Sequence, residues 1–188
     1  MSADLGVMLN PTAAYSQMFA QPAGRASWTF WRRPLFLALV LGCMVSLLTL
    51  RSLSLRLVLS SMAAWAFVPL FEIGALMAVW RTKRATVSLP AAVDLFFTGH
   101  GPWSLWSIGL GAFGSWFPDF PEPAFSAWEC SVCAILVWSW YIDLCFFRCF
   151  SARPVRDLLV QRAISWSLFL AVWGGGWLPS DILGRLGL

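Results

Sequence analysis

The stretch LVLSSMAAWAFVPLFEIGALMAVW, residues 57–80, decides the class of protein to which this chain belongs. Glu72 is the only charged side chain in the stretch. About 20 apolar residues in a helix cross the roughly 30 Å hydrocarbon layer of a bilayer. The stretch therefore predicts a helix that spans a membrane.

The composition of the whole chain agrees with that prediction. Hydrophobic residues make up 59% of the 188 residues and charged residues only 12%, whereas soluble domains average about 25% charged residues. The chain also holds 13 tryptophans and 15 phenylalanines, and aromatic rings of this kind collect at the headgroup level of a bilayer. We interpret the net charge of +4 as a sign of membrane topology, and we expect no nucleic-acid binding.

Four more apolar runs accompany residues 57–80, so the sequence predicts an all-α, polytopic transmembrane bundle of five spans. Arg51 and Arg56 lie in the short turn between the first two runs. Two arginines in a turn on the outer side are unexpected. A bundle of four spans is therefore the alternative, in which the first two runs form a hairpin that does not cross the membrane completely. The four other runs are residues 34–50, 95–117, 127–147 and 163–179.

The distribution of basic residues predicts the orientation. With the N-terminus in the cytoplasm, ten lysines and arginines lie in inner segments and three in outer segments, as the positive-inside rule requires. We therefore expect a cytoplasmic N-terminal segment over residues 1–33 and a transmembrane bundle over residues 34–188. The first long apolar run follows Arg32 and Arg33, so we expect no cleavable signal peptide and a location in a bacterial cytoplasmic membrane.

Two polar segments predict helices that lie on the membrane surface. In residues 10–19, Asn10 is suited to cap a helix that starts with Pro11, and Tyr15 belongs to its apolar face. The second segment, residues 153–166, carries three arginines. We expect them to face anionic lipids of the inner leaflet, each contributing about 1 kcal/mol. They are Arg153, Arg156 and Arg162.

Glu72 is the first candidate for a functional residue, since an ionisable group within a span is costly to bury. It lies eight residues before Trp80, or about 12 Å from that end of the helix. Pro69 removes a helix donor and leaves the Trp65 carbonyl without its usual partner. Pro69 and Glu72 together allow two interpretations. The first is a kinked polar spot for an ion, a proton or another helix, and the second is a carboxyl that holds the bundle together.

Two further polar residues are candidates at the ends of spans. His100 is the only histidine and lies in Gly-His-Gly-Pro, a pattern typical of a boundary where a helix starts near Pro102; sensing of pH is the alternative role. Asp143 precedes Arg148 by five residues, so we expect an ion pair between them at the inner boundary.

The remaining patterns argue against an enzyme. Cys130 and Cys133 have the spacing of a redox pair, but Cys145 and Cys149 fall at the opposite end of the same run, and packing is the better interpretation. The sequence contains no phosphate-binding loop, nucleophile elbow or paired-carboxylate constellation. We therefore expect no enzymatic activity, no catalytic residue, no cofactor and no metal ligand.

The order of the segments resembles that of one family. NPTAAYSQMFAQP ahead of a tryptophan-arginine-proline segment, followed by five apolar runs, is similar to prokaryotic members of the Yip family of multi-span membrane proteins. The resemblance implies five spans, a cytoplasmic N-terminus and no catalytic residue. The leading hypothesis is thus a non-enzymatic membrane protein that organises partner membrane proteins or lipid. The alternatives are a small transporter that uses Glu72 and a thiol redox protein that uses Cys130 and Cys133.

Overall fold

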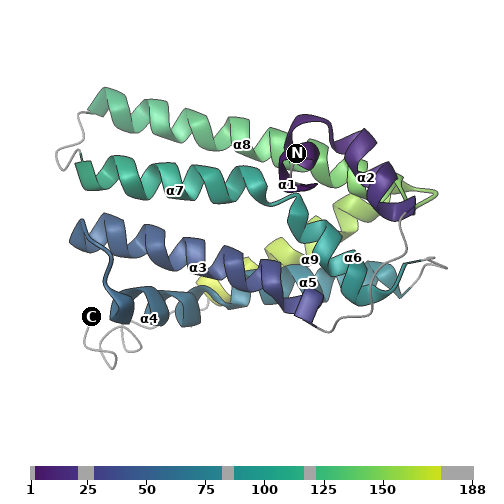
Figure 1. The fold of residues 1–188 in the computed structure, drawn as a ribbon, viewed down its shortest axis with the longest axis horizontal. Coiled ribbons are helices and arrows are strands. Elements are labelled where there is room, and N and C mark those ends of the chain that lie inside the picture. The colour runs from purple at the N-terminus through teal and green to yellow at the C-terminus, as the bar shows by residue number, and fades with distance from the viewer. Residues whose placement is uncertain (1–2, 21–27, 82–86, 117–121, 175–188) are drawn as a thin grey trace.

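The structure is a computed structural model that describes residues 3–20, 28–81, 87–116 and 122–174. All regular elements in these residues are helices, so the predicted all-α fold is confirmed for them (Figure 1). The helices are α1 (Ala3–Leu9), α2 (Pro11–Ala20), α3 (Trp28–Leu50), α4 (Leu55–Trp65), α5 (Phe67–Trp80), α6 (Leu89–Thr98), α7 (Gly101–Trp116), α8 (Glu122–Arg148) and α9 (Pro154–Gly174).

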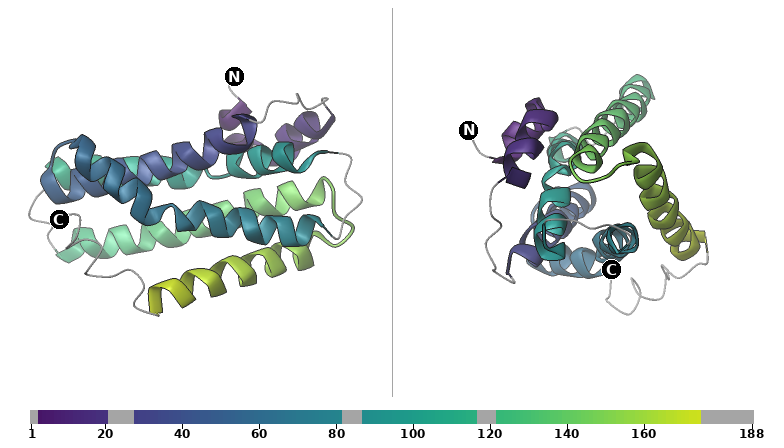
Figure 2. Two further views of the ribbon diagram at one scale, coloured as in Figure 1. Left: turned by 90° about the horizontal axis from the view of Figure 1, so that it is seen from below. Right: turned by 90° about the vertical axis from the view of Figure 1, so that its right-hand side faces the viewer.

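The helices run back and forth between two ends of an elongated bundle (Figures 1 and 2). Helix α3 leads from one end to the other, α4 and α5 return, α6 and α7 go out again, α8 returns, and α9 goes out. We call the end where α3 starts and α8 stops the basic end, and the other the far end. Described arginines of the basic end are Arg32, Arg33, Arg81, Arg148, Arg153 and Arg156.

Three helical segments are long and apolar enough to cross a membrane, namely Phe30–Leu50, Leu55–Trp80 and Cys130–Arg148. Helix α6 is a shorter apolar helix. Many large apolar side chains on these segments are exposed, among them Leu59 at 55% and Val137 at 71%. Such exposure suits a surface that contacts lipid. The apolar helices support a membrane protein, while the count of five spans stays a prediction.

The second predicted span is broken by one residue, Ala66, between α4 and α5. Pro69, which is buried in the first turn of α5, has no N–H to donate to the carbonyl of Trp65. The helix tightens there, and the Ala66 N–H bonds to the Ala63 carbonyl at 3.4 Å. The kink expected from Pro69 is therefore present.

The third predicted run, residues 95–117, is divided differently from the prediction. Its described residues, 95–116, comprise the end of α6 and the whole of α7, which meet at Gly99 and His100, and residue 117 lies outside the described residues. The start of α7 at Gly101 agrees with the prediction of a helix near Pro102. Residues 89–94, ahead of the predicted run, form the first half of α6, with Ser88 at its N-cap position and Pro90 in its first turn.

The N-terminal segment forms helices, but its apolar face packs on protein. The Asn10 side chain accepts a hydrogen bond from the Ala13 N–H at 3.3 Å, which is the expected cap of α2. Tyr15 is completely buried, and its ring lies 5.6 Å from that of Phe146 in α8. The prediction of a helix is correct, while the expectation that Tyr15 faces the membrane is wrong.

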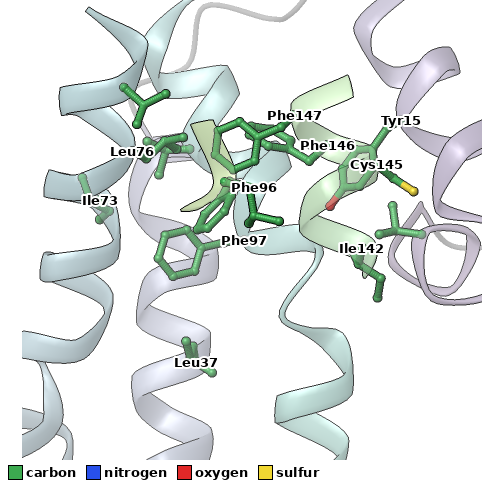
Figure 3. Close-up of a cluster of buried hydrophobic side chains, with 14 residues drawn as sticks. Tyr15, Leu37, Ile73, Leu76, Phe96, Phe97, Ile142, Cys145, Phe146 and Phe147 are labelled. Atoms are coloured by element: carbon green, nitrogen blue, oxygen red, sulfur yellow. The ribbon is translucent and has the colours of Figure 1, made fainter. Parts of the chain in front are cut away.

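The main apolar core lies toward the basic end, where α2, α5, α6 and α8 meet. Figure 3 shows Phe96 and Phe97 of α6 gathered with Phe146 and Phe147 of α8 and with Tyr15. The ring of Phe96 is 5.4 Å from that of Phe146, edge to face, a favourable geometry for aromatic pairs. This core holds α6 and α8 together next to the polar residues in the middle of the bundle, which are described below.

Helix α9 corrects two boundaries. The sequence predicts a surface helix over residues 153–166 and a separate span over 163–179. The structure instead has one continuous helix from Pro154 to Gly174. Residues 175–179 of that predicted span lie outside the described residues.

Candidate functional site

Glu72 is held at the centre of a polar cluster inside the bundle. Its Oε1 accepts a hydrogen bond from Nη1 of Arg162 at 2.8 Å, and its Oε2 accepts one from Nε2 of Gln161 at 3.3 Å. Nε2 of His100 lies 3.5 Å from the same Oε2. Only 13% of the Glu72 side chain is exposed, so these groups replace the water that an acid of this kind would otherwise bind.

Asp143 joins the same cluster from α8, through a short contact between its Oδ2 and Nη2 of Arg162. The sequence analysis paired Asp143 with Arg148, and this is wrong. Arg148 is exposed at the end of α8, whereas Asp143 is fully buried. The five-residue spacing places the two side chains on different faces of a helix, because neighbours on one face are three or four residues apart.

Arg162 differs most from its prediction. It was expected to face lipid headgroups, but only 8% of it is exposed and it binds both carboxylates of the cluster. Arg153 and Arg156 are exposed, as expected for basic residues near headgroups. The sequence did contain a signal for Arg162. It lies eight residues after the start of α9, and Glu72 lies eight residues before the end of α5, so helical rise places both at a similar depth.

We define the buried cluster as Glu72, His100, Asp143, Gln161 and Arg162. With both carboxyl groups ionised and the imidazole neutral, two carboxylates and one guanidinium leave one negative charge in excess. The sequence analysis identified Glu72, His100 and Asp143 separately, and the structure brings them together. It did not identify Gln161, which is completely buried; a polar residue next to an arginine gives no signal of its own.

His100 lies at the break between α6 and α7 and also in the buried cluster. Its ring stacks on that of Phe97 at 4.7 Å, with 20° between the planes, and its Nδ1 has no hydrogen-bond partner in the described residues. The break lets the chain pass close to α2, since a Cβ on Gly99 would lie 2.8 Å from the Tyr15 hydroxyl. His100 therefore marks a helix boundary, as predicted, and contacts Glu72 as well.

A cavity of about 430 Å³ opens beside the buried cluster, between α3, α4, α5, α7, α8 and α9. Small-molecule sites in proteins have cavities of about 300–1,000 Å³. Three residues of the cluster line it, together with serines and a largely aromatic and aliphatic wall. The cluster residues are Glu72, His100 and Arg162, and the serines are Ser107, Ser139 and Ser165.

A second acid–arginine cluster lies at the basic end, and we call it the rim cluster. Asp94 of α6 accepts hydrogen bonds from Arg32 Nε and Nη2, at 2.7 and 2.6 Å. Arg33 Nη1 bonds to the Asp94 carboxylate and to its carbonyl oxygen, each at 2.8 Å. The sequence analysis used these arginines for topology alone and did not pair them with Asp94, which comes 62 residues after Arg32.

The cysteines do not form a site in the described residues. Cys130 and Cys133 are free and exposed on α8. Cys145 is buried, and its sulfur lies 3.4 Å from the hydroxyl of Thr12 in α2. Burial raises the pKa of the Cys149 thiol above its usual value, which disfavours the reactive thiolate. No group of three metal-ligating side chains occurs among the residues that the structure describes.

No family model, curated protein or solved structure matches this chain. The resemblance to the Yip family therefore has no support from these comparisons and stays a prediction from the sequence.

Proposed function

We propose that the chain is a multi-pass protein of the bacterial cytoplasmic membrane that has no enzymatic activity and organises partner membrane proteins or lipid. In this proposal α3, α4–α5, α6–α7, α8 and α9 are five passages, and the N-terminus lies in the cytoplasm. Support comes from three helices of spanning length and from the basic end, which holds Arg32, Arg33, Arg81 and Arg148, as the positive-inside rule requires.

One observation supports a structural role for the charged residues inside the bundle. The ionised groups within the bundle bind one another: Glu72 and Asp143 both contact Arg162. They come from three different helices, α5, α8 and α9. Polar contacts of this kind join helices within a membrane. The exposed apolar surface of the spans is then left for lipid and for other membrane proteins.

Labelling tests the topology. Single cysteines at positions 122 and 153 of a cysteine-free variant should react with an impermeant maleimide from opposite sides of the membrane. We expect residue 122 to react from the outside and residue 153 from the cytoplasm. Reaction of position 122 from the cytoplasm alone would overturn the five-passage topology.

A second candidate function is transport of a small molecule or ion, and the cavity beside Glu72 favours it. The variants Glu72→Gln and Glu72→Leu distinguish the two functions. If Glu72 only joins helices, Gln keeps a hydrogen bond to Arg162 and should preserve folding and the growth phenotype, while Leu should weaken the bundle more. If Glu72 serves transport, the Gln variant should fold normally and lose flux, because an amide can neither carry charge nor exchange a proton.

The measurements are melting of both variants in detergent and the growth or flux phenotype of cells that carry them. A well-folded but inactive Gln variant would reject the organising function and support transport. The partner proteins themselves would be identified by co-purification in mild detergent. The Glu72→Leu variant serves as the control, since a partner lost only with it depends on bundle integrity.

A further inference from the structure

We propose that the cavity beside the buried cluster binds a monovalent organic cation with an aromatic or apolar body. The proposal deepens the second candidate function, because it names the class of ligand that would be transported. Only the movement of the ligand across the membrane rests on that function. Binding itself depends on the cavity, its aromatic wall and the charge of the cluster.

Aromatic side chains form much of the wall of the cavity. Six aromatic side chains line it from α4, α5, α7, α8 and α9: Trp65, Phe71, Trp103, Trp140, Trp166 and Phe169. The face of an aromatic ring carries negative charge density and attracts cations, most strongly for tryptophan. Four of the six rings are tryptophans, so the wall can bind the charge and the apolar body of such a ligand together.

The charge of the buried cluster selects the sign of the ligand. Glu72 lines the cavity, and Asp143 lies directly behind it on the same guanidinium. Arg162 is shared between two acids, so one negative charge has no counterpart when both acids are ionised and His100 is neutral. An uncompensated charge away from water is costly. A cation in the cavity would supply the missing charge, whereas an anion would add to the excess.

The same lining argues against an inorganic ion as the ligand. Hard metal cations bind six or more oxygen atoms in proteins, but the side chains at the cavity that carry oxygen are one carboxylate and three serine hydroxyls. The described residues contain no group of three metal-ligating side chains. The rest of the wall is apolar and matches a hydrophobic ligand body.

Binding to the full-length protein in detergent tests the site, with two probes of the same shape and opposite charge. We expect tetraphenylphosphonium to bind saturably in equilibrium dialysis, and tetraphenylborate to bind about tenfold more weakly or not at all, because only the cation balances the cluster. Equal binding of the two probes, or no saturable binding of tetraphenylphosphonium, would overturn the proposal.

Matched variants locate the binding. Glu72→Gln should lower the affinity for tetraphenylphosphonium about tenfold or more. Asp94→Asn makes the same charge change in the rim cluster, outside the cavity, and should leave the affinity unchanged. Trp166→Leu should weaken binding, and Trp116→Leu should not, since Trp116 does not line the cavity and is 78% exposed. Unchanged affinity in both cavity variants would overturn the proposal.

Folding and transport are assessed separately. Asp143→Asn removes the same excess charge without altering a residue of the wall, so it should also weaken tetraphenylphosphonium binding if the charge argument holds. Uptake of the probe into vesicles that contain the protein tests movement. Binding without uptake would keep the cation site and reject transport, and loss of binding in a variant with normal melting excludes misfolding as its cause.

Discussion

The buried cluster and the rim cluster are built from the same side chains in opposite proportions. Inside the bundle, two acids share one arginine, Arg162, which is 9% exposed at its side chain. At the basic end, two arginines share one acid, and the Arg32 side chain is 45% exposed. The rim cluster therefore has an excess positive charge that water and headgroups can solvate. When both acids are ionised and His100 is neutral, the buried cluster has an excess negative charge that only protein or a ligand can balance.

The comparison teaches that position, more than composition, decides what such a cluster does. An exposed ion pair adds about 0–1 kcal/mol to stability. Removing one partner of a buried pair costs about 3–5 kcal/mol, because it leaves an unpaired charge away from water. The two clusters should thus respond very differently to equivalent substitutions.

Arg162→Met should have the largest effect. It leaves Glu72 and Asp143 close together without a cation, and we expect the free energy of unfolding to fall by about 3–5 kcal/mol. Unfolding in mixed micelles measures it. Arg148→Met is the matched control, since Arg148 is exposed at the end of α8; a loss there as large as that of Arg162→Met would erase the difference between the clusters.

Replacement of the whole charged group should restore most of that loss. A variant with Arg162→Met, Glu72→Met and Asp143→Met has no carboxylate and no guanidinium left in the buried cluster, and we expect its stability to lie within about 2 kcal/mol of the unaltered chain. The same unfolding measurement applies. If the triple variant were less stable than Arg162→Met alone, the two acids would stabilise the fold even without Arg162, and the expected restoration would be wrong.

Arg33→Met should have an intermediate effect. The Arg33 side chain is 17% exposed, and its loss removes two hydrogen bonds to Asp94, so we expect a loss of about 1–2 kcal/mol. Arg32→Met should cost less, about 0–1 kcal/mol, because the Arg32 side chain is more exposed. The reverse order in unfolding experiments would contradict the role given to burial.

Salt should produce the smallest effect and act on the rim cluster alone. The Debye length falls from about 10 Å at 0.1 M salt to about 3 Å at 1 M. The destabilisation caused by Arg32→Met should therefore shrink at high salt, by a few tenths of a kcal/mol. The destabilisation caused by Arg162→Met should stay the same. Equal salt dependence of the two would mean that water reaches the buried cluster.

Features that depend on neighbouring residues could be predicted from the sequence. Three apolar helices of spanning length, the cap at Asn10 and the kink at Pro69 are confirmed, because each has its cause in neighbouring residues of the chain. The start of α6 also has a local signal, Ser88 followed by Pro90. The predicted apolar run starts only at residue 95, so it contains the end of α6 but not its first half.

The pairing of charged residues could not be predicted in the same way. Asp143 and Arg162 are 19 residues apart and Glu72 and Arg162 are 90 apart, so their contacts follow from helix packing. A local rule paired Asp143 with Arg148 and placed Arg162 at the membrane surface. Equal depth within the bundle predicts the pairing of charged residues better, because an ionised group within a span needs a partner at the same depth.

The long separation between Glu72 and Arg162 also sets an order of events during synthesis. Ribosomes add about 5–20 residues per second, so Arg162 is made roughly 5 to 18 s after Glu72, 90 residues earlier in the chain. The segment that carries Glu72 must therefore leave the ribosome before its guanidinium exists. Its insertion has to be driven by its own apolar residues, and α9 joins α5 and α8 only as a late step of assembly.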